Sequence, residues 1–280
     1  MPSLGNALYS SMYRSGRFLC RFRGTAFANR VASAVAAMAE QLENVNWDFE
    51  KNGERRVLER MRLCTPKCAF DVGANRGDWC TKFAALYPSC EIHAFEVVPA
   101  TFEQLRDSVE SNPNIILNNF GLSDETATII LSVADADSSV ASACPIKGMK
   151  YHDQYYTRQV QGQVRKAVDY VRENGIGTID FLKVDVEGMY LKVLKGLENA
   201  ISQARVIQFE YGIFNSSLHD LLSDFFVYLS GKGFIVGRIF PRHVDFFDYH
   251  FSREKFYGGN YVAVKRDEDT LITALAAYGR

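Results

Sequence analysis

The fold of this chain is decided at residues 70–78, which read Phe-Asp-Val-Gly-Ala-Asn-Arg-Gly-Asp. An apolar run at 69–72 leads into the sequence Gly73-x-x-x-Gly77, and a segment of helical periodicity follows. Glycines at such a turn let the backbone approach a ligand, and the first turn of the helix offers free N–H groups. The loop is neither a Walker A motif nor Gly-x-Gly-x-x-Gly. It predicts a ligand-binding strand, loop and helix, with a plain tight turn as the alternative.

Strand and helix signals alternate along the chain after this loop. Seven β-rich runs are expected to form the main sheet, at residues 69–72, 92–95, 114–120, 179–186, 205–210, 234–240 and 260–265. Helical segments separate most of these runs, which predicts a parallel sheet with helices on both faces. No long helix separates the last two runs, so these two should pair antiparallel. The expected fold class is α/β, with a Rossmann-like sheet of seven mostly parallel strands and a terminal antiparallel hairpin.

Two segments depart from the repeating pattern. Residues 127–133, which read Ala-Thr-Ile-Ile-Leu-Ser-Val, are β-rich without an intervening helix, and we expect an inserted hairpin arm there. Residues 134–171 are polar, have weak periodicity and connect two expected strands. Long irregular connections within a compact domain are usually functional, so we interpret residues 134–171 as a substrate lid.

Composition limits the classes of function. The 280 residues are 47% hydrophobic and 23% charged with a net charge of −1, which is ordinary for a globular domain and gives no indication of a nucleic-acid partner. Six scattered cysteines lack the spacing of a disulfide scaffold and favour reduced thiols. No apolar run approaches the ~20 residues needed to span a bilayer. We therefore expect a cytoplasmic protein without a transmembrane segment.

The start of the chain differs in charge from the rest. Residues 1–39 contain five arginines and no acidic residue, whereas the remaining residues contain 27 basic and 33 acidic ones. We expect a basic helical extension at residues 1–43 and one domain at residues 44–280. An arginine-rich, acid-poor start is typical of a transit peptide or of a helix that contacts a membrane surface weakly. The alternative is a helical cap with solvated arginines.

Glu96 stands at the end of the second expected strand, about 20 residues after the glycine loop, where doubly wound sheets often carry an acid. A carboxylate at that position accepts hydrogen bonds from both ribose hydroxyls of an adenosyl cofactor. A nicotinamide enzyme also needs such an acid, but with the other glycine pattern. The alternative for Glu96 is a solvated acid at a strand end.

Three ionisable residues share one face near the end of the expected strand 179–186, namely Lys183, Asp185 and Glu187. Central parallel strands are usually apolar, so such charges are costly unless they serve one another or a ligand. Ligands bind at this edge in open α/β sheets. Glu210 ends the next strand and should lie on the same rim. The alternative is a structural network of ion pairs.

These motifs resemble the FkbM family of methyltransferases in order and spacing. The matching motifs are Asn52-Gly53-Glu54, Asp71-Val-Gly-Ala-Asn-x-Gly77, Glu96, Leu182-Lys-Val-Asp-Val-Glu-Gly188 and Val193-Leu-Lys-Gly196. The resemblance covers about residues 44–265 and leaves out the N-terminal segment. It implies a class I methyltransferase fold, S-adenosylmethionine as methyl donor, and O-methylation of a hydroxyl on a sugar, polyketide or related small metabolite. Arg76, where many such loops carry an aliphatic or small polar residue, can change the cofactor contacts.

Each candidate residue then has an expected role. The expected cofactor-binding residues are Asp71, Gly73, Asn75 and Gly77 in the loop, Glu96 at the ribose, and Ser123 or Asp124 at the adenine end. The expected catalytic residues are Asp185 as general base, Lys183 and Glu187 beside it, and His243 or His152 as alternative bases. The expected substrate contacts are Glu210 and Tyr211.

A divalent ion held by Asp185, Glu187 and Glu210 would acidify an acceptor hydroxyl, but no spacing in the sequence requires one. The alternative function is a non-catalytic protein that keeps the cofactor-binding fold as a scaffold or sensor. The charged residues Lys183, Asp185 and Glu187 argue against it. A dinucleotide enzyme is disfavoured by the glycine pattern, and a nucleic-acid methyltransferase by the lack of an Asn/Asp-Pro-Pro-aromatic motif.

Overall fold

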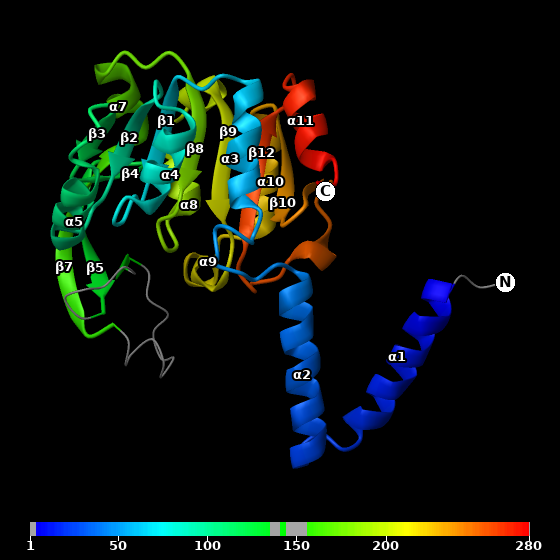
Figure 1. Cartoon of the computed structure of the whole chain (residues 1–280). Helices are drawn as coiled ribbons and strands as arrows, with labels where there is room; N and C mark the ends of the chain where they lie inside the picture. The colour runs from blue at the N-terminus through cyan, green and yellow to red at the C-terminus, as the bar shows by residue number, and fades with distance from the viewer. Residues whose placement is uncertain (1–3, 135–140, 144–155, 280) are drawn as a thin grey trace. The chain divides into compact units, whose positions relative to one another are not determined.

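The structure is a computed structural model that describes residues 4–134, 141–143 and 156–279. It divides into two compact units, Met1–Val45 and Asn46–Arg280 (Figure 1). Parts of the expected lid, residues 135–140 and 144–155, lie outside the described residues, as does the alternative base His152.

The first unit consists of two helices, α1 (Leu4–Cys20) and α2 (Ala26–Leu42). A turn at residues 21–25 joins them, and Thr25 caps α2 because its hydroxyl accepts a hydrogen bond from the backbone N–H of Ala28 at 3.3 Å. Among the described residues, no helix combines the length and the apolar character needed to cross a bilayer.

The second unit contains a doubly wound sheet of eight strands. In spatial order the strands are β11 (His243–Phe246), β10 (Phe234–Phe240), β12 (Asn260–Lys265), β9 (Ala204–Glu210), β8 (Ile179–Val184), β1 (Cys68–Val72), β2 (Glu91–Phe95) and β3 (Ile115–Asn118). The expected number of seven is therefore wrong. The additional strand is β11, which is only four residues long and mostly half-buried, so its sequence lacks a clear strand pattern.

Strand directions agree with the expected class I arrangement. The five strands from β3 to β9 are parallel, whereas β12 runs antiparallel to both of its neighbours. The predicted antiparallel pairing of residues 234–240 with residues 260–265 is thus confirmed. The central strand β8 ends at Val184, two residues earlier than expected, so Asp185 and Glu187 lie in the turn that follows it.

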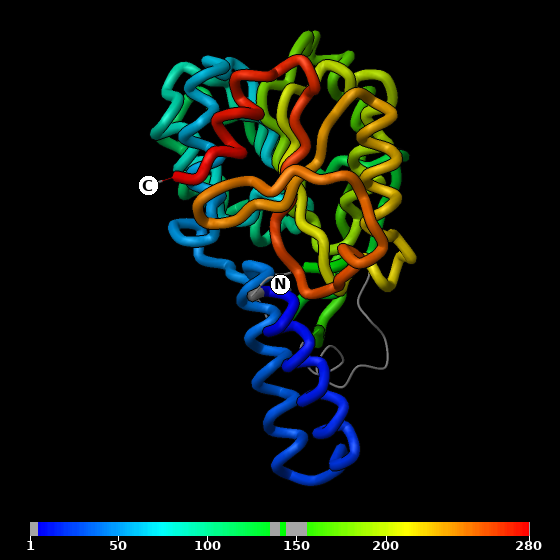
Figure 2. The backbone as a smooth tube through the Cα atoms, turned by 90° about the vertical axis from the view of Figure 1, so that its right-hand side faces the viewer, coloured from blue at the N-terminus to red at the C-terminus, as the bar shows by residue number. Residues whose placement is uncertain are grey.

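Helices cover both faces of this sheet, as expected from the repeated βα pattern. Figure 2 shows helices on either side of the sheet when it is viewed from the edge that carries β10 and β11. The helices are α3 (Glu54–Arg60), α4 (Asp78–Leu86), α5 (Pro99–Val109), α7 (Ala167–Glu173), α8 (Tyr190–Gly196), α9 (Ile213–Leu218), α10 (Leu222–Gly231) and α11 (Asp269–Ala276), with short 3₁₀ turns at Met61–Leu63, Ala200–Gln203 and Phe251–Arg253.

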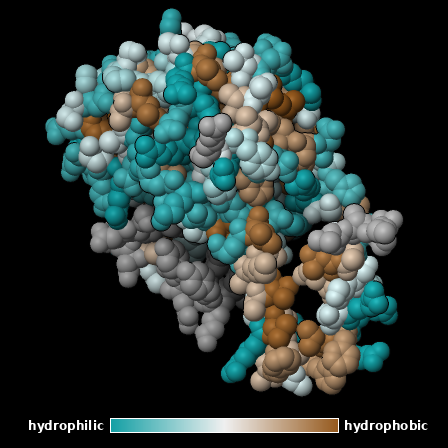
Figure 3. Space-filling view, turned by 45° about the vertical axis from the view of Figure 1, so that its right-hand side comes forward, coloured by the Kyte–Doolittle hydropathy of each residue, from teal (hydrophilic) through white to brown (hydrophobic). Residues whose placement is uncertain are grey.

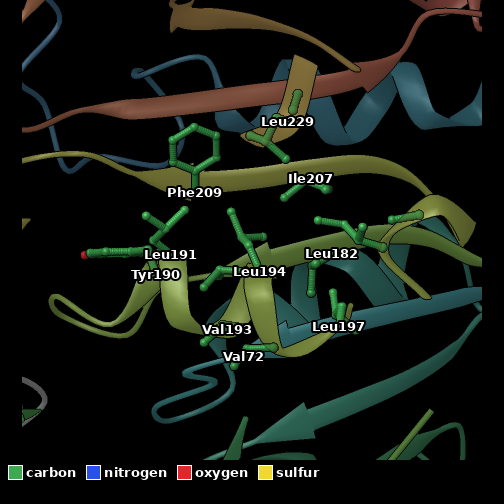
Figure 4. Close-up of a cluster of buried hydrophobic side chains, with 14 of the residues drawn as sticks. Val72, Leu182, Tyr190, Leu191, Val193, Leu194, Leu197, Ile207, Phe209 and Leu229 are labelled. Carbon is green, nitrogen blue, oxygen red and sulfur yellow. The ribbon is translucent and has the colours of Figure 1, made fainter. Parts of the chain in front are cut away.

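Alternate residues of the central strands feed two separate hydrophobic cores. Leu182, Val184 and Ile207 pack with α7, α8 and α10 on one face of the sheet. Figure 4 shows Leu182 and Ile207 beside the α8 side chains, with Leu229 of α10 above them. Phe181 and Val206 pack with α3, α4, α5 and α11 on the other face. The period of two therefore directs Lys183 to the second face, into a region that is otherwise apolar.

A second sheet stands beside the β3 end of the first. It contains four strands in the order β4 (Gly121–Ser123), β7 (Arg158–Lys166), β5 (Ala127–Val133) and β6 (Ala141–Ser142). The strand predicted at residues 127–133 pairs antiparallel with β7, which confirms a hairpin arm. The connection after β5 is not irregular throughout, because β7 and the start of α7 occupy residues 158–171.

Truncation of a core side chain tests the packing. We expect Leu229→Ala, in α10 and fully buried, to lower the free energy of unfolding by about 2–5 kcal/mol through lost burial and a cavity. The matched control is Val227→Ala, because Val227 lies in the same helix and is 74% exposed. Urea unfolding followed by circular dichroism measures both. Equal midpoints for the two variants would contradict this packing.

Candidate functional site

A cavity of about 500 Å³ opens at the carboxyl ends of β1, β2 and β8. Its lining comes from the loop after β1, the end of β2, the turn after β8, the start of α3 and the second sheet. The edge at which parallel strands end is where doubly wound sheets bind ligands. Six of the expected site residues line this cavity, namely Gly73, Asn75, Glu96, Lys183, Asp185 and Glu187.

The glycine loop forms one wall of the cavity and depends on two left-handed glycines. Gly73 has φ +88°, and a Cβ there would lie 1.8 Å from the carbonyl oxygen of Asp185. Gly77 has φ +85°, and its Cβ would meet the side chains of Leu105 and Val109. Gly73 and Asn75 line the cavity, whereas Gly77 serves the packing of α4 against α5.

Glu96 closes the end of β2 and lines the cavity. Its two carboxylate oxygens accept hydrogen bonds from the backbone N–H groups of Asn75 at 2.9 Å and Val98 at 2.8 Å. Burial raises the pKa of Glu96 to about 6, although these N–H groups act in the opposite direction. Each oxygen keeps a lone pair for a further donor. Glu96 is therefore oriented and partly ionised before any ligand arrives.

The second sheet supplies an apolar wall next to Glu96. Ile129 and Leu131 of β5, Val164 of β7 and Leu122 of β4 line the cavity, together with Val97 and Val98 after β2. Several of these side chains form a small hydrophobic cluster of their own. The wall suits a flat apolar group such as a base.

Lys183 lies between two carboxylates at the floor of the site. Its Nζ is 3.3 Å from Oδ1 of Asp71 and 3.2 Å from Oδ2 of Asp185. Burial alone would lower the pKa of Lys183, but Asp71 and Asp185, with Glu54, raise it above its usual value. The lysine therefore stays charged. Asp71 is fully buried and also accepts a hydrogen bond from the Cys80 thiol, so it positions Lys183 and does not line the cavity.

Three acids, Asp185, Glu187 and Glu210, lie after β8 or at the end of β9 and influence one another electrostatically. Asp185 and Glu187 both line the cavity. Burial and the charge of Asp185 raise the pKa of Glu187 to about 8, while Lys183 lowers it. Burial, Asp185 and Glu187 also raise the pKa of Glu210, which accepts a hydrogen bond from the Tyr190 hydroxyl at 3.3 Å. Glu210 ends β9 near these acids but does not line the cavity.

Glu54 is a site residue to which we assigned no role from sequence. It lines the cavity and is 9% exposed at the start of α3. Its carboxylate accepts hydrogen bonds from the side-chain amides of Asn52, Gln208 and Asn260. The motif Asn52-Gly53-Glu54 was the sequence signal that could have identified Glu54. The contacts that hold Glu54 at the site come from strands that are distant in the sequence.

Trp79 of α4 also lines the cavity and is 5% exposed. Its ring lies near Lys183, with 6.0 Å between Nζ and the ring centroid. Within the described residues, the buried indole N–H of Trp79 has no hydrogen-bond acceptor. Buried donors are normally satisfied, so an acceptor from a ligand or water fits here.

Two expected adenine contacts lie away from the cavity. Ser123 is buried at the end of β4, and its hydroxyl donates to Asp124 at 3.1 Å. Gly196 packs so closely on the carbonyl of Ser123 that a Cβ would come within 1.9 Å of the oxygen. Neither Ser123 nor Asp124 lines the cavity, because β4 packs against α8.

Tyr211 and His243 are also placed elsewhere. The hydroxyl of Tyr211 donates to Glu254, and its ring is fully buried in the α10 core, so the side chain is unavailable to a substrate. His243 begins β11, at the edge of the sheet, where its ring stacks on those of Phe240 and Tyr278. The tight turn before β11 sends His243 away from the cavity, so it is not supported as a catalytic base.

No cluster of three or more His, Cys, Asp or Glu side chains in the described ranges is arranged to hold a metal ion. Asp185, Glu187 and Glu210 influence one another electrostatically without forming such a cluster. The site therefore gives no geometric support for a divalent ion.

Several known proteins are similar to this chain. Methyltransferase 1 of Beauveria bassiana is 29% identical over 143 residues, covering 46% of this chain and 57% of the relative. 2-O-methyltransferase NoeI of Sinorhizobium fredii is 24% identical over 150 residues, covering 51% and 62% respectively. Hexuronic acid methyltransferase AglP of Haloferax volcanii is 25% identical over 158 residues, covering 55% and 61%. The matched part thus spans about three fifths of each of these relatives.

The model of one protein family also matches the chain. It describes the methyltransferase FkbM domain and covers residues 71–236, from the end of β1 through the glycine loop, β2 and β8 into β10. This is more than half of the chain, and it includes Asp71, Glu96 and the motif around Lys183. The chain belongs to the FkbM methyltransferase family.

Proposed function

We propose that this protein transfers a methyl group from S-adenosylmethionine to a hydroxyl of a sugar or related small metabolite. The observation that carries the proposal is that Glu96 and the Lys183, Asp185 and Glu187 group line or adjoin one cavity at the sheet edge. Glu96 can accept hydrogen bonds from ribose hydroxyls, and the group of Lys183, Asp185 and Glu187 can take up the proton of the acceptor hydroxyl. Membership of the FkbM family supports the same reaction class.

The groups on the cofactor side fit an adenosyl ligand. The free lone pairs of Glu96 are suited to two ribose hydroxyls, and Val97, Val98 and Leu122 offer an apolar surface beside it for the base. The unsatisfied indole N–H of Trp79 suits an acceptor on the amino-acid part. S-adenosylmethionine supplies, when bound, an electrophilic methyl group on a sulfonium.

The groups on the acceptor side fit removal of a hydroxyl proton. Asp185 lines the cavity and is held in an ion pair with Lys183, with 3.2 Å between Nζ and Oδ2. Glu187 has a pKa near 8 and lies beside it. We therefore propose that the ionised form of Glu187, next to Asp185, accepts the proton of the acceptor hydroxyl. Asp71 and Lys183 position this pair, and Glu54 holds the surrounding polar groups.

The class of acceptor rests on the relatives and on the second sheet. NoeI is a 2-O-methyltransferase and AglP acts on hexuronic acid, which supports a hydroxylated sugar. Ser142 of β6 donates a hydrogen bond to the carbonyl of Glu187 at 2.8 Å, which links the segment 134–171 to the base. We infer that this segment acts as a lid over the acceptor, within one catalytic domain at residues 44–280.

The five described cysteines are free, which supports a reducing, cytosolic location.

Binding of S-adenosylhomocysteine tests the cofactor side. We expect Glu96→Ala to weaken binding by about 10- to 100-fold, because hydrogen bonds to a charged group contribute about 1.5–3 kcal/mol. The matched control is Glu91→Ala, since Glu91 lies at the other, exposed end of β2. Isothermal titration calorimetry measures all three proteins. An unchanged affinity in Glu96→Ala would place the ribose elsewhere, and no binding to folded wild-type protein would remove the main support for methyl transfer.

The affinity for S-adenosylhomocysteine should also fall as the pH is lowered. Because the pKa of Glu96 is about 6, the carboxylate is mostly ionised at neutral pH and becomes protonated as the pH falls through that value. Protonation removes acceptor capacity, so we expect the affinity for S-adenosylhomocysteine to fall on acidification. Glu96→Gln should not show this fall. Calorimetry at a series of pH values distinguishes the two.

The acceptor side predicts a titration near pH 8 for Glu187. In Asp185→Asn a negative neighbour is lost and Lys183 is freed from its partner, so the pKa of Glu187 should fall. NMR of ¹³C-labelled glutamate side chains, assigned with Glu187→Gln, measures both values. With a sugar acceptor, the rate of methyl transfer should rise with pH up to the same pKa, and Glu187→Gln should lower it by about 10²-fold or more. A normal pKa for Glu187 would contradict its role as base.

A further inference from the structure

The first unit carries apolar side chains that the other described residues of the same unit leave exposed. In α1, Leu8, Tyr9, Met12 and Tyr13 are 57–71% exposed, although they repeat at helical spacing. Figure 3 shows apolar side chains, coloured brown, along the surface of these helices. Exposed apolar surface that is continuous along a helix usually marks an interaction site.

The apolar residues of α2 form one stripe. Phe27, Val35, Met38 and Leu42 are 58–69% exposed and, at about 100° per residue, fall within about 80° of one another around the helix. In α1 Arg14 lies about 160° from Met12 by the same count, on the polar side, whereas Arg17 lies about 40° from Tyr13, and its guanidinium is 6.0 Å from the centroid of that ring. Both helices are therefore amphipathic, and the apolar side of each faces solvent.

The charge on this unit is mostly positive, since its acids, Glu40 and Glu43, both lie near its end. Residues 1–39 contain Arg14, Arg17, Arg21, Arg23 and Arg30 and no acidic residue. The side-chain partners found for two of them are neutral: Arg14 donates to the carbonyl of Ser10, and Arg23 donates to Asn29. A helical cap with solvated arginines would leave the exposed apolar stripes unexplained.

An anionic lipid surface offers both a negative charge for the arginines and an apolar layer for the exposed apolar side chains. Its headgroups supply negative charge for the arginines, and the boundary of its acyl chains accepts the leucine, methionine and aromatic side chains. A nucleic acid would meet the arginines but leave the apolar stripes in water. Pairing of the same unit from two copies would cover the stripes but bring ten arginines together with four acids, Glu40 and Glu43 of each copy.

We infer that α1 and α2 bind the surface of an anionic membrane, lying in its interface. Each helix has 17 residues and would turn its apolar residues toward the acyl chains, while the arginines of α1, of the turn after it and Arg30 of α2 reach the headgroups. This surface is independent of the methyl-transfer site, and its test does not require catalytic activity.

Sedimentation of the full chain with vesicles tests the inference. Vesicles of phosphatidylcholine with phosphatidylglycerol should bind the protein at least about tenfold more tightly than pure phosphatidylcholine, and added salt should weaken the binding. Arg14→Gln with Arg17→Gln should weaken it by about 25-fold, because each basic residue near an anionic surface contributes about fivefold. The matched control is Arg106→Gln with Arg172→Gln, two exposed arginines of the second unit.

A second double variant tests the contribution of the exposed apolar side chains. Leu8→Ser with Met12→Ser should weaken binding about tenfold or more, whereas Ile130→Ser with Val227→Ser, which changes exposed apolar residues of the second unit, should not. Thermal unfolding of each variant checks that the second unit remains folded. Lack of binding by the wild type to anionic vesicles would overturn the inference. A dimer seen in analytical ultracentrifugation would also overturn it, if the double variant Leu8→Ser with Met12→Ser dissociated that dimer and the wild type did not bind vesicles. Binding to DNA that is tighter than binding to the vesicles would overturn it as well.

Discussion

The ammonium group of Lys183, held between the carboxylates of Asp71 and Asp185, is the interaction on which the site depends. It joins the two central strands at a register pair and brings a positive charge into an otherwise apolar core. Removing one member of a buried ion pair typically costs about 3–5 kcal/mol, since the remaining charge stays buried. The same lysine restrains the pKa of Glu187. Stability of the sheet centre and the basicity of the site therefore depend on one side chain.

Around this pair, the site is assembled from elements that are far apart in the sequence. Glu54 reaches it from α3 and is held by amides from β9 and β12, while Glu96 is held by N–H groups of the glycine loop and of the residues after β2. The second sheet adds the apolar wall and, through Ser142, a contact with the turn that carries Glu187. Few of these polar groups lack a partner within the described chain, so the cavity is largely preorganised.

Much of this arrangement was predictable because periodicity and strand ends are local signals. The glycine loop, the parallel strands and the charged end of β8 followed from residue spacing, and their convergence follows from the geometry of a parallel sheet. The contacts of Ser123, Tyr211 and His243 were not predictable, because each depends on a partner distant in the sequence: α8, Glu254 and Tyr278. Glu54 was missed for the same reason, since its amide partners lie on other strands.

The close packing at Gly73 has a mechanical consequence. No methyl group fits between Gly73 and the carbonyl of Asp185, and the N–H of Asp185 bonds to the carbonyl of Val72 at 2.8 Å. The glycine loop and the turn after β8 are thus in direct backbone contact and cannot shift separately. Any group bound against the glycine loop would therefore also restrain the turn after β8, and the restraint would act equally in the other direction.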